Sequence, residues 1–417
     1  MSLWVYLKAH IEKYTDRIAF ANAKLTYKDI LAFEKNPETK KLILCEGQTK
    51  EEQAITILKC IAEGNVAVPI TKEYGKVNYE YINKIVKNPS QQDISDLAFL
   101  MFTSGTTGCP KGVMLTEQNI VSNLEYISTY FDVRLMRTIC ISRPLVHIAV
   151  LTGELLYSLC NGLTLYFYEE AFMPQRLLTY FANNKIDIFC ATPTLYYALA
   201  VAMKSKLIPL KIGVTSGEIL LSKVSAKLKE RFPYTAFYNV YGLTEHSPRV
   251  SALRPMEFWN KPNSVGKPIE GVEVKIQEGE LLVKSDSVMR GYYNDERQTQ
   301  EKIKAGWLHT GDMAHFDSDG YLYIDGRKDN MMIRAGINVY PEEIESKVYD
   351  IAGIFDCVVY CDQTEVGKTL VLKYIGDVEP KDVRKSLMKQ LNPNIIPNRI
   401  EKVDKLEKTA SGKKQRA

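Results

Sequence analysis

The stretch Thr103–Gly112 reads TSGTTGCPKG and carries more information than any other part of this 417-residue sequence. It contains three glycines, four hydroxyl side chains, one proline and one lysine, and it follows the wholly apolar run Leu97–Phe102. That run predicts a buried strand. In the loop after it, glycines let backbone N–H groups turn toward one point, while the hydroxyls and Lys111 add donors and positive charge. Such a loop suits a phosphate.

The loop differs from a Walker A loop, which requires Gly, four residues and then Gly-Lys-Ser/Thr. Counted from Gly105, Lys111 falls at the expected position, but Pro110 replaces the second glycine and Gly112 replaces the Ser/Thr that would hold magnesium. A dinucleotide loop is also excluded, because no G-x-G-x-x-G follows this strand. The sequence therefore predicts a phosphate loop of another kind, with a plain surface loop as the alternative.

Composition limits the classes of protein to which the chain can belong. Its 417 residues exceed the roughly 250–300 at which a single core stops growing, so two or more domains are expected. Apolar content of 45%, charged content of 25% and a net charge of +4 are ordinary for a soluble protein and do not point to nucleic acid. The N-terminal apolar patch is too short for a signal peptide, and no apolar run approaches the ~20 residues of a spanning helix. We expect a cytoplasmic protein without a nucleic-acid or membrane partner.

Cysteine and histidine give no sign of a structural metal site. The eight cysteines lie mostly in apolar surroundings, no CxxC occurs, and the five histidines are scattered. We therefore expect reduced thiols in the core and no structural zinc.

Helical and extended patterns alternate along the first 265 residues. Apolar spacings of three and four predict a helix over 51–62, and Thr26 is a candidate helix cap. Short apolar runs predict buried strands at 65–70, 163–168 and 186–190. This alternation is the α/β pattern.

The pattern changes near residue 265. The segments 272–276 and 280–284 have no helix between them, so they predict a hairpin or small antiparallel sheet, and a second hairpin is expected at the turn Asp317–Gly320. Gly326–Asp329 is interpreted as a hinge. The expected α+β tail beyond it has strands at 331–334, 356–361 and 369–375 and helices at 341–349 and 380–391.

Five motifs occur in a fixed order: TSGTTGCPKG from Thr103, YNVYGLTE from Tyr238, GWLHTGD from Gly306, GRKDN from Gly326 and TASGK from Thr409. In this order the chain closely resembles the acyl-adenylate-forming (AMP-binding) enzymes, which include acyl- and aryl-CoA synthetases, adenylation domains of peptide synthetases and firefly luciferase. The resemblance runs from about residue 25 to the end.

The resemblance implies an α/β fold. The large N-terminal domain, residues 1–327, would consist of α/β layers with a distorted β-barrel and bind ATP and the acid. The small mobile α+β domain, residues 328–417, would be a lid with its hinge near Asp329. The implied reaction has two steps: a carboxylate attacks the α-phosphate of ATP to give acyl-AMP and pyrophosphate, and a phosphopantetheine thiol then takes the acyl group.

The resemblance also implies roles for single residues. Glu245 would hold Mg²⁺, which needs few carboxylates beside phosphate oxygens, and Thr244 would contact the α-phosphate. Asp312 and Arg327 would bind the ribose. The remaining nucleotide contacts would be the phosphate loop (Thr103, Ser104, Gly105, Thr106, Thr107, Gly108 and Lys111), Gly217 and Glu218 along the adenine, and Tyr241 stacked on it.

Lys413 is the expected catalytic lysine. In the family, the lysine after this Ser-Gly bridges the substrate carboxylate and the α-phosphate, and a cation there offsets the repulsion of two anions. Rotation about Asp329 would withdraw Lys413 and bring Gly336 in to shape a thiol tunnel.

The acid pocket is expected around His147, Asn239, Val240 and Gly242. Peptide-synthetase domains hold an α-ammonium with an aspartate in the segment that matches 144–149, but residues 143–153 contain no acidic residue here. A buried ammonium without a counter-charge is costly, so an α-amino acid is not expected. Only 102 residues precede the phosphate loop, which makes the chain look like compact ligases that load one small acid onto a carrier protein.

The narrower prediction is an aryl acid such as dihydroxybenzoate, as in siderophore biosynthesis, and a phosphopantetheinylated carrier protein, for which the basic C-terminal tail would be suited. The main alternative is an acyl- or aryl-CoA synthetase that uses free CoA. A catalytically silent binding protein and a luciferase-like oxygenase are further alternatives that the sequence leaves open.

Overall fold

The computed structural model describes residues 1–35, 39–71, 75–103, 110–203, 208, 210–334, 337–364 and 367–407, with side chains except at 332–338 and 363–368. The chain forms two compact units. The first comprises Met1–Lys275, Leu282–His309 and Ser318–Leu322; the second comprises Ile276–Leu281, Thr310–Asp317 and Tyr323–Ala417. The predicted boundary between residues 327 and 328 and the hinge near Asp329 stay predictions.

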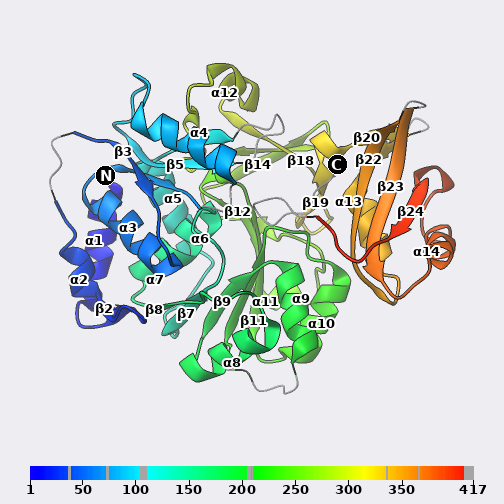
Figure 1. The fold of residues 1–417 in the computed structure, drawn as a ribbon, viewed down its shortest axis with the longest axis horizontal. Coiled ribbons are helices and arrows are strands. Elements are labelled where there is room, and N and C mark those ends of the chain that lie inside the picture. Colours follow the sequence, from blue (N-terminus) through cyan, green and yellow to red (C-terminus); the bar gives the residue numbers. More distant parts are fainter. Residues whose placement is uncertain are drawn as a thin grey trace. The chain divides into compact units, whose positions relative to one another are not determined.

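A nine-stranded sheet is the largest element of the first unit (Figure 1). From β11 to β1 along the sheet, neighbouring strands are parallel. The strands at the two edges, β2 on one side and β12 and β13 on the other, pair antiparallel. Near-continuous apolar segments such as Ile188–Ala191 suit this middle position, because parallel strands are buried on both faces. Its order is β13 (Lys267–Pro268), β12 (Arg249–Leu253), β11 (Ala236–Gly242), β10 (Ile212–Ser216), β9 (Ile188–Ala191), β7 (Thr138–Ile141), β8 (Thr164–Phe167), β1 (Ile18–Phe20), β2 (Leu25–Thr26).

A second sheet of the first unit contains the strand that was predicted from the apolar run before the phosphate loop. Its order is β16 (Gly291–Tyr292), β6 (Lys111–Thr116), β5 (Leu97–Thr103), β4 (Val66–Pro69), β3 (Leu42–Cys45). Strand β5 is buried from Leu97 to Phe102 and pairs antiparallel with β6. The loop 104–109 between β5 and β6 lies outside the described residues.

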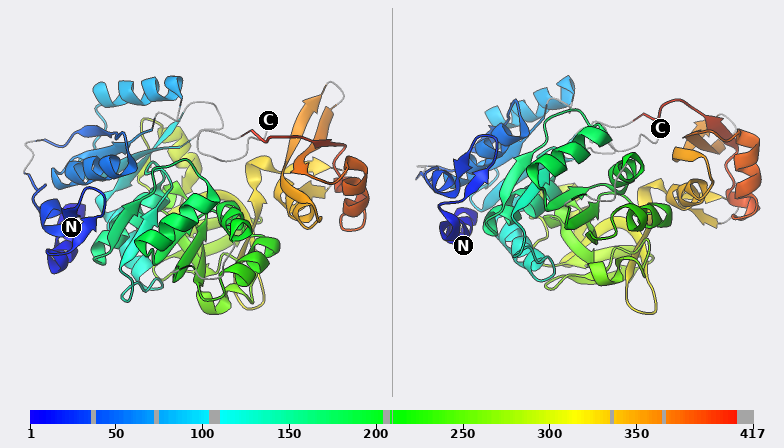
Figure 2. Two further views of the ribbon diagram at one scale, coloured as in Figure 1. Left: turned by 60° about the horizontal axis from the view of Figure 1, so that its bottom comes forward. Right: turned by 90° about the horizontal axis from the view of Figure 1, so that it is seen from below.

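Helices cover these sheets. Apolar side chains of α8, α9, α10 and α11 form one core with β9, β11 and β12, and Figures 1 and 2 show α8, α9 and α10 against the nine-stranded sheet. The predicted cap Thr26 is confirmed: its side chain accepts from the backbone N–H of Asp29. The helices are α1 (Leu3–Ile11), η1 (Glu12–Tyr14), α2 (Tyr27–Leu31), α3 (Lys50–Ala62), α4 (Lys76–Lys87), α5 (Glu117–Ser128), α6 (Ile148–Val150), the π-helix η3 (Leu151–Leu156), α7 (Tyr157–Cys160), α8 (Pro174–Asn184), α9 (Pro193–Ala202), α10 (Ser222–Arg231), η4 (Thr244–His246), α11 (Pro255–Phe258) and α12 (Glu296–Lys302).

The small sheet that was predicted after residue 265 is present. Its order is β14 (Glu273–Gln277), β15 (Glu280–Lys284), β18 (Trp307–Phe316), β17 (Ile303–Lys304), and β19 (Leu322–Arg327) pairs with β18. The hairpin predicted at the turn Asp317–Gly320 is therefore confirmed as β18–β19.

The second unit contains the predicted α+β tail, drawn in orange and red in Figure 2. Helix α13 (Pro341–Tyr349) has the predicted bounds, whereas α14 (Pro380–Leu387) ends four residues before the expected Leu391. The residues after Leu387 form turns ahead of Pro393, and the position before a proline disfavours helix. The other elements are η5 (Lys328–Asn330), β20 (Met332–Arg334), β21 (Ile337–Val339), β22 (Ile354–Thr364), β23 (Gly367–Gly376), η6 (Pro393–Ile395) and β24 (Arg399–Lys402).

Candidate active site

The β5–β6 hairpin positions the two described ends of the phosphate loop. Thr103 ends β5, Lys111 begins β6, and the two are register partners. The Lys111 ammonium lies 5.5 Å from the centroid of the Tyr292 ring, a cation–π contact that fixes where the positive charge stands. The predicted contacts Ser104, Gly105, Thr106, Thr107 and Gly108 lie outside the described residues.

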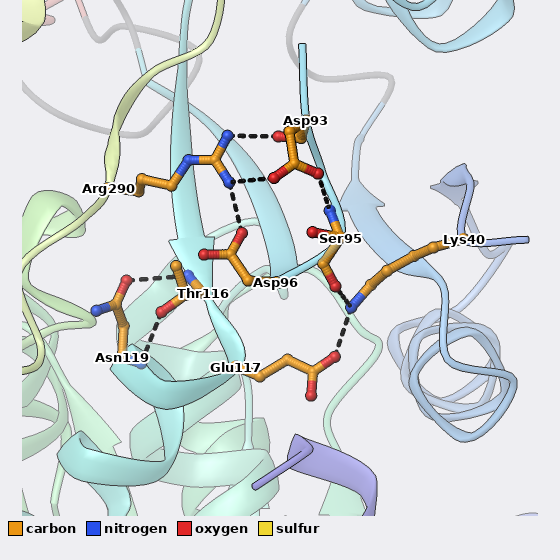
Figure 3. A network of polar contacts seen from close by, with 8 residues as sticks. All are labelled: Lys40, Asp93, Ser95, Asp96, Thr116, Glu117, Asn119 and Arg290. Carbon is orange, nitrogen blue, oxygen red and sulfur yellow. Dashed lines mark hydrogen bonds and ion pairs between the residues drawn. The ribbon is translucent and has the colours of Figure 1, made fainter. Parts of the chain in front are cut away.

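A polar network holds the other end of this hairpin (Figure 3). Arg290 binds the Asp96 carboxylate at 2.5 Å and the backbone carbonyl of Asp93, and Lys40 binds the Glu117 carboxylate and the Ser95 carbonyl. These contacts lie beside the register pair Leu97–Thr116, six residues along β5 from Thr103. The base of the β5–β6 hairpin is therefore tied to neighbouring segments.

Glu245 reaches the same part of the first unit from a distant segment. It lies in the short helix η4, directly after β11, and its side chain is half-buried. The Tyr292 hydroxyl donates a hydrogen bond of 2.9 Å to Glu245 Oε1, and the Met289 N–H donates to the Glu245 carbonyl at 2.8 Å. One tyrosine thus contacts both Lys111 and Glu245.

Sequence reasoning missed Tyr292. The residue lies in β16, where it is the register partner of Val113 in β6. The only sign of it in the sequence is the run Gly291–Tyr293, and a Gly-Tyr-Tyr run does not indicate which residues the tyrosine contacts. Only the pairing of β16 with β6 shows that its ring lies beside Lys111.

The residue after Glu245, His246, is a buried histidine. His246 is fully buried, its Nε2 lies 2.7 Å from Ser285 Oγ, and burial lowers its pKa to about 3. The buried Asn123 amide donates to the backbone carbonyls of His246 and Arg249. The imidazole is therefore neutral near pH 7 and serves as a structural anchor beside the candidate metal ligand.

The candidate adenine segments follow β10 and end β11. Gly217 has a φ of +87°, which favours glycine, and a Cβ there would meet only the Thr192 methyl, at 3.9 Å. The Glu218 carboxylate accepts from the Thr194 N–H at 3.1 Å and from its hydroxyl at 2.6 Å, so this side chain also caps the start of α9. Tyr241 is half-buried in β11.

The candidate ribose residues are neighbours within the second unit. Arg327 donates to Asp312 Oδ1 at 3.0 Å and to the Thr310 carbonyl at 3.2 Å. Asp312 is 7% exposed and Arg327 also pairs with Asp329, the predicted hinge residue, at 3.3 Å. The Arg327 guanidinium orients the Asp312 carboxylate and still has other N–H donors. A carboxylate with neighbouring donors suits the binding of a vicinal diol.

The candidate pocket residues all belong to the first unit. His147 is half-buried at the start of α6, and Val240 is buried in β11. Asn239 is buried too. Its Nδ2 donates to the Ser264 carbonyl, and its Oδ1 accepts from the Thr215 hydroxyl. A Cβ at Gly242 would lie 1.9 Å from the Pro248 carbonyl oxygen, so that position requires glycine.

Three further observations concern ligands. A cavity of about 200 Å³ is lined mainly by α1, the end of α3 and Glu117, and none of the predicted site residues lines it. In the described part of the chain, no three His, Cys, Asp or Glu side chains gather as a metal cage. A magnesium site of one carboxylate beside phosphate oxygens needs no such cage, so the half-buried carboxylate of Glu245 fits Mg²⁺.

Lys413 lies in 408–417, outside the described residues.

No helix in the described ranges is long and apolar enough to cross a membrane.

Comparison with known proteins identifies the family. The family model for AMP-binding enzymes matches residues 7–293. A feruloyl-CoA synthase from an Amycolatopsis species is 30% identical over 339 residues, which cover 77% of this chain and 68% of that protein. A long-chain-fatty-acid–CoA ligase from Bacillus subtilis is 32% identical over 343 residues, covering 76% of this chain and 60% of that ligase.

Solved structures agree on the fold. The o-succinylbenzoate-CoA synthetase from Bacillus subtilis with its acyl-adenylate intermediate superposes with a TM-score of 0.83 at 22% identity, covering 100% of this chain and 97% of that one. The anthranilate-CoA ligase AuaEII in complex with anthranoyl-AMP gives a TM-score of 0.85 at 21% identity, covering 99% and 95%. The predicted family and α/β fold class are confirmed: this chain belongs to the AMP-binding enzymes and is an ATP-dependent, adenylate-forming acid–thiol ligase.

Proposed function

We propose that this ligase activates a small carboxylic acid as its acyl-adenylate and passes the acyl group to a phosphopantetheine thiol. The observation that carries the proposal is the contact of Tyr292 with both Lys111 and Glu245. It brings a cation from the phosphate loop and a carboxylate from a segment more than 130 residues away to one place. Attack on the α-phosphate builds negative charge on the leaving pyrophosphate, and such charge is stabilised by fixed cations.

Each proposed residue has a distinct task in this reaction. Lys111 and the loop 103–108 would bind the β- and γ-phosphates, and Thr244 would donate to the α-phosphate. Glu245 would hold Mg²⁺, which neutralises phosphate charge when bound; the o-succinylbenzoate-CoA synthetase has been solved with ATP and magnesium ion. Lys413 would stand between the acid carboxylate and the α-phosphate.

The nucleoside contacts would come from two groups of residues. Asp312 would accept from the ribose hydroxyls, and Arg327, which already fixes the Asp312 carboxylate, would donate to them. Tyr241 would stack on adenine beside Gly217 and Glu218. The acid would bind between His147 and the segment Asn239–Gly242.

The thiol acceptor has two candidates. The relatives feruloyl-CoA synthase and long-chain-fatty-acid–CoA ligase are named for CoA, which favours free CoA. The basic residues after Lys405 favour a carrier protein, with an aryl acid such as dihydroxybenzoate as the substrate. Both acceptors present the same phosphopantetheine thiol, so the first half-reaction is common to them.

The test is a panel of carboxylic acids in ATP–pyrophosphate exchange, followed by transfer to CoA and to phosphopantetheinylated carrier protein. Exchange that depends on one class of acid is the expected result. Failure of every acid, in enzyme shown to be folded, would refute the proposal. Efficient turnover of free CoA would select the CoA synthetase, whereas transfer to the carrier protein alone would select the carrier-protein ligase.

A further inference from the structure

Three charged side chains cluster in the first unit, two of them buried and Arg143 with 14% of its side chain exposed: Arg143, Glu154 and Arg249. Glu154 is completely buried in the π-helix η3, Arg249 is 4% exposed at the start of β12, and Arg143 follows β7. Arg143 Nη2 donates to Glu154 Oε1 at 2.5 Å, and its Nη1 donates to Ser216 Oγ at 3.1 Å. We call these three residues the Arg–Glu–Arg cluster.

Arg249 reaches the cluster because Gly153 leaves room for it. A Cβ at Gly153 would lie 2.7 Å from Arg249 Nη2, so any side chain there would displace the guanidinium from its place beside Glu154. Within the described residues, no carboxylate lies within ion-pair distance of Arg249. Tyr130 lies close enough for its pKa to be affected by Arg249, but burial raises the pKa of that phenol, so Tyr130 supplies no negative charge.

The cluster consequently carries more positive than negative charge. Two guanidinium groups face one carboxylate, and the neighbouring thiols Cys140 and Cys190 are neutral because burial raises their pKa. Burial also raises the pKa of Glu154, against the effect of the two arginines, and protonation of Glu154 would only enlarge the surplus. A buried charge without a counter-charge is costly, so this site favours an additional anion.

The cluster adjoins the segments of the proposed acid pocket and of the adenine site. Arg143 precedes His147 by four residues, its partner Ser216 directly precedes Gly217, and Arg249 is the register partner of Gly242. Two polar atoms of the cluster, Arg143 Nε and Glu154 Oε2, are buried without a hydrogen-bond partner in the described structure. π-Helical turns such as η3 frequently occur at functional sites.

We propose that the Arg–Glu–Arg cluster binds a second anionic group of the acid, and that the substrate class is therefore a compact dicarboxylic acid. One carboxylate is activated by ATP, while the other binds the Arg249 guanidinium. Glu154 holds Arg143 in place. This inference rests on the proposed function, and it disfavours dihydroxybenzoate, whose uncharged hydroxyls would leave the surplus charge uncompensated.

A purely structural role accounts for only part of the cluster. The Arg143–Glu154 pair ties the end of β7 to η3, and a tie of this kind needs one cation. It gives no reason to bury a second guanidinium, that of Arg249, next to Gly153 without a carboxylate partner among the described residues.

The experiment compares short aliphatic and aromatic dicarboxylic acids with their half-amides, which keep the shape but lose the second charge. In ATP–pyrophosphate exchange, the best diacid should exceed its half-amide in kcat/KM by about 100-fold or more, because a site built for a hydrogen-bonded partner rejects the analogue that lacks it. Arg249→Gln should lower kcat/KM for the diacid by about 100-fold and change that for the half-amide by less than about threefold. The matched control is Arg134→Gln, at an exposed arginine that pairs with Asp132, and it should behave as wild type.

The outcomes separate this inference from the proposed function. Equal kcat/KM for diacids and half-amides in the wild-type enzyme would overturn the dicarboxylate inference and leave the ligase activity standing. Absence of exchange with any acid would overturn the proposed function as well. If Arg249→Gln does not fold, Arg249→Lys and thermal stabilisation of the wild-type protein decide: with AMP present, a diacid should raise Tm and its half-amide should not, and equal shifts would refute the inference.

Discussion

The Tyr292 hydroxyl donates a 2.9 Å hydrogen bond to Glu245 Oε1, while the same ring lies 5.5 Å from the Lys111 ammonium. Glu245 would bind the metal and Lys111 would bind phosphate, so Tyr292 sets the relative position of two charges that must act on one nucleotide. It would touch neither ligand itself, which makes it a positioning residue.

Tyr292→Phe is expected to weaken magnesium activation. The variant keeps the ring beside Lys111 but removes the hydroxyl that orients the Glu245 carboxylate, and loss of a residue that orients a metal ligand typically costs 10–100-fold in metal affinity or activity. The measurement is ATP–pyrophosphate exchange over a range of magnesium concentrations. We expect the half-activating concentration to rise by about tenfold, with a smaller effect on KM for the acid.

The neighbouring residue supplies the control. The Tyr293 hydroxyl is also hydrogen-bonded, but to Ser90 and not to Glu245. It accepts from the Ser90 N–H at 3.0 Å and lies 2.9 Å from Ser90 Oγ. Tyr293→Phe should therefore leave the magnesium dependence unchanged. An equal shift in both variants would show that the effect is general loss of packing and not the Glu245 contact.

Asp312→Asn is expected to raise KM for ATP. The substitution keeps the shape of the side chain but removes the charge that pairs with Arg327 at 3.0 Å, and hydrogen bonds to charged groups are worth about 1.5–3 kcal/mol, or roughly 10–150-fold. Initial rates over a range of ATP concentrations measure it. Asp325→Asn, which breaks the exposed Asp325–His315 pair in the same unit, is the control and should keep the wild-type KM.

The local elements were predictable because their signals are local. The helix cap Thr26, helix α13 and the buried strand β5 each follow from residues within one short segment. The contacts of the site were not predictable in this way. Tyr292 meets Glu245 only because β16 pairs with β6, and the Arg249 guanidinium packs beside η3 only because Gly153 leaves space for it. Glu154 itself lies one residue beyond the segment 143–153, which contains no acidic side chain.

His246 predicts loss of stability in mild acid. Burial holds its pKa at about 3 in the folded protein, below the 6.5 of a free imidazole, so between these values the unfolded chain binds a proton that the folded chain does not. Stability that depends on a neutral His246 is therefore fully present above about pH 6.5 and is lost as the pH falls. At pH 5 this effect has lowered the free energy of unfolding by about 2 kcal/mol. Urea unfolding of wild type and His246→Gln at pH 7.5 and 5.0 measures it.

The gap in unfolding free energy between wild type and His246→Gln should be smaller at pH 5.0 than at pH 7.5, because the variant has no proton to gain at this position. A gap that stays constant between the two pH values would mean that His246 does not titrate on unfolding.

The network at the base of the β5–β6 hairpin predicts unequal costs for two carboxylates (Figure 3). Glu117 accepts from the Lys40 ammonium and from the Leu3 N–H at 2.9 Å, and the side chains of Lys40 and Glu117 are only 15% and 21% exposed. Asp96 is 52% exposed and pairs with Arg290. Glu117→Ala should lower the free energy of unfolding by about 2 kcal/mol, because two bonded donors lose their acceptor, whereas Asp96→Ala should cost only about 0.5 kcal/mol.

Salt separates the two causes. Because exposed pairs are screened by ions, 1 M NaCl should remove most of the Asp96→Ala effect and leave most of the Glu117→Ala effect, which rests on partly buried hydrogen bonds. Urea unfolding at low and high salt measures both variants in one series. Equal costs for the two variants would contradict this account, because the Lys40–Glu117 contacts would then hold the hairpin no more firmly than the exposed Arg290–Asp96 pair does.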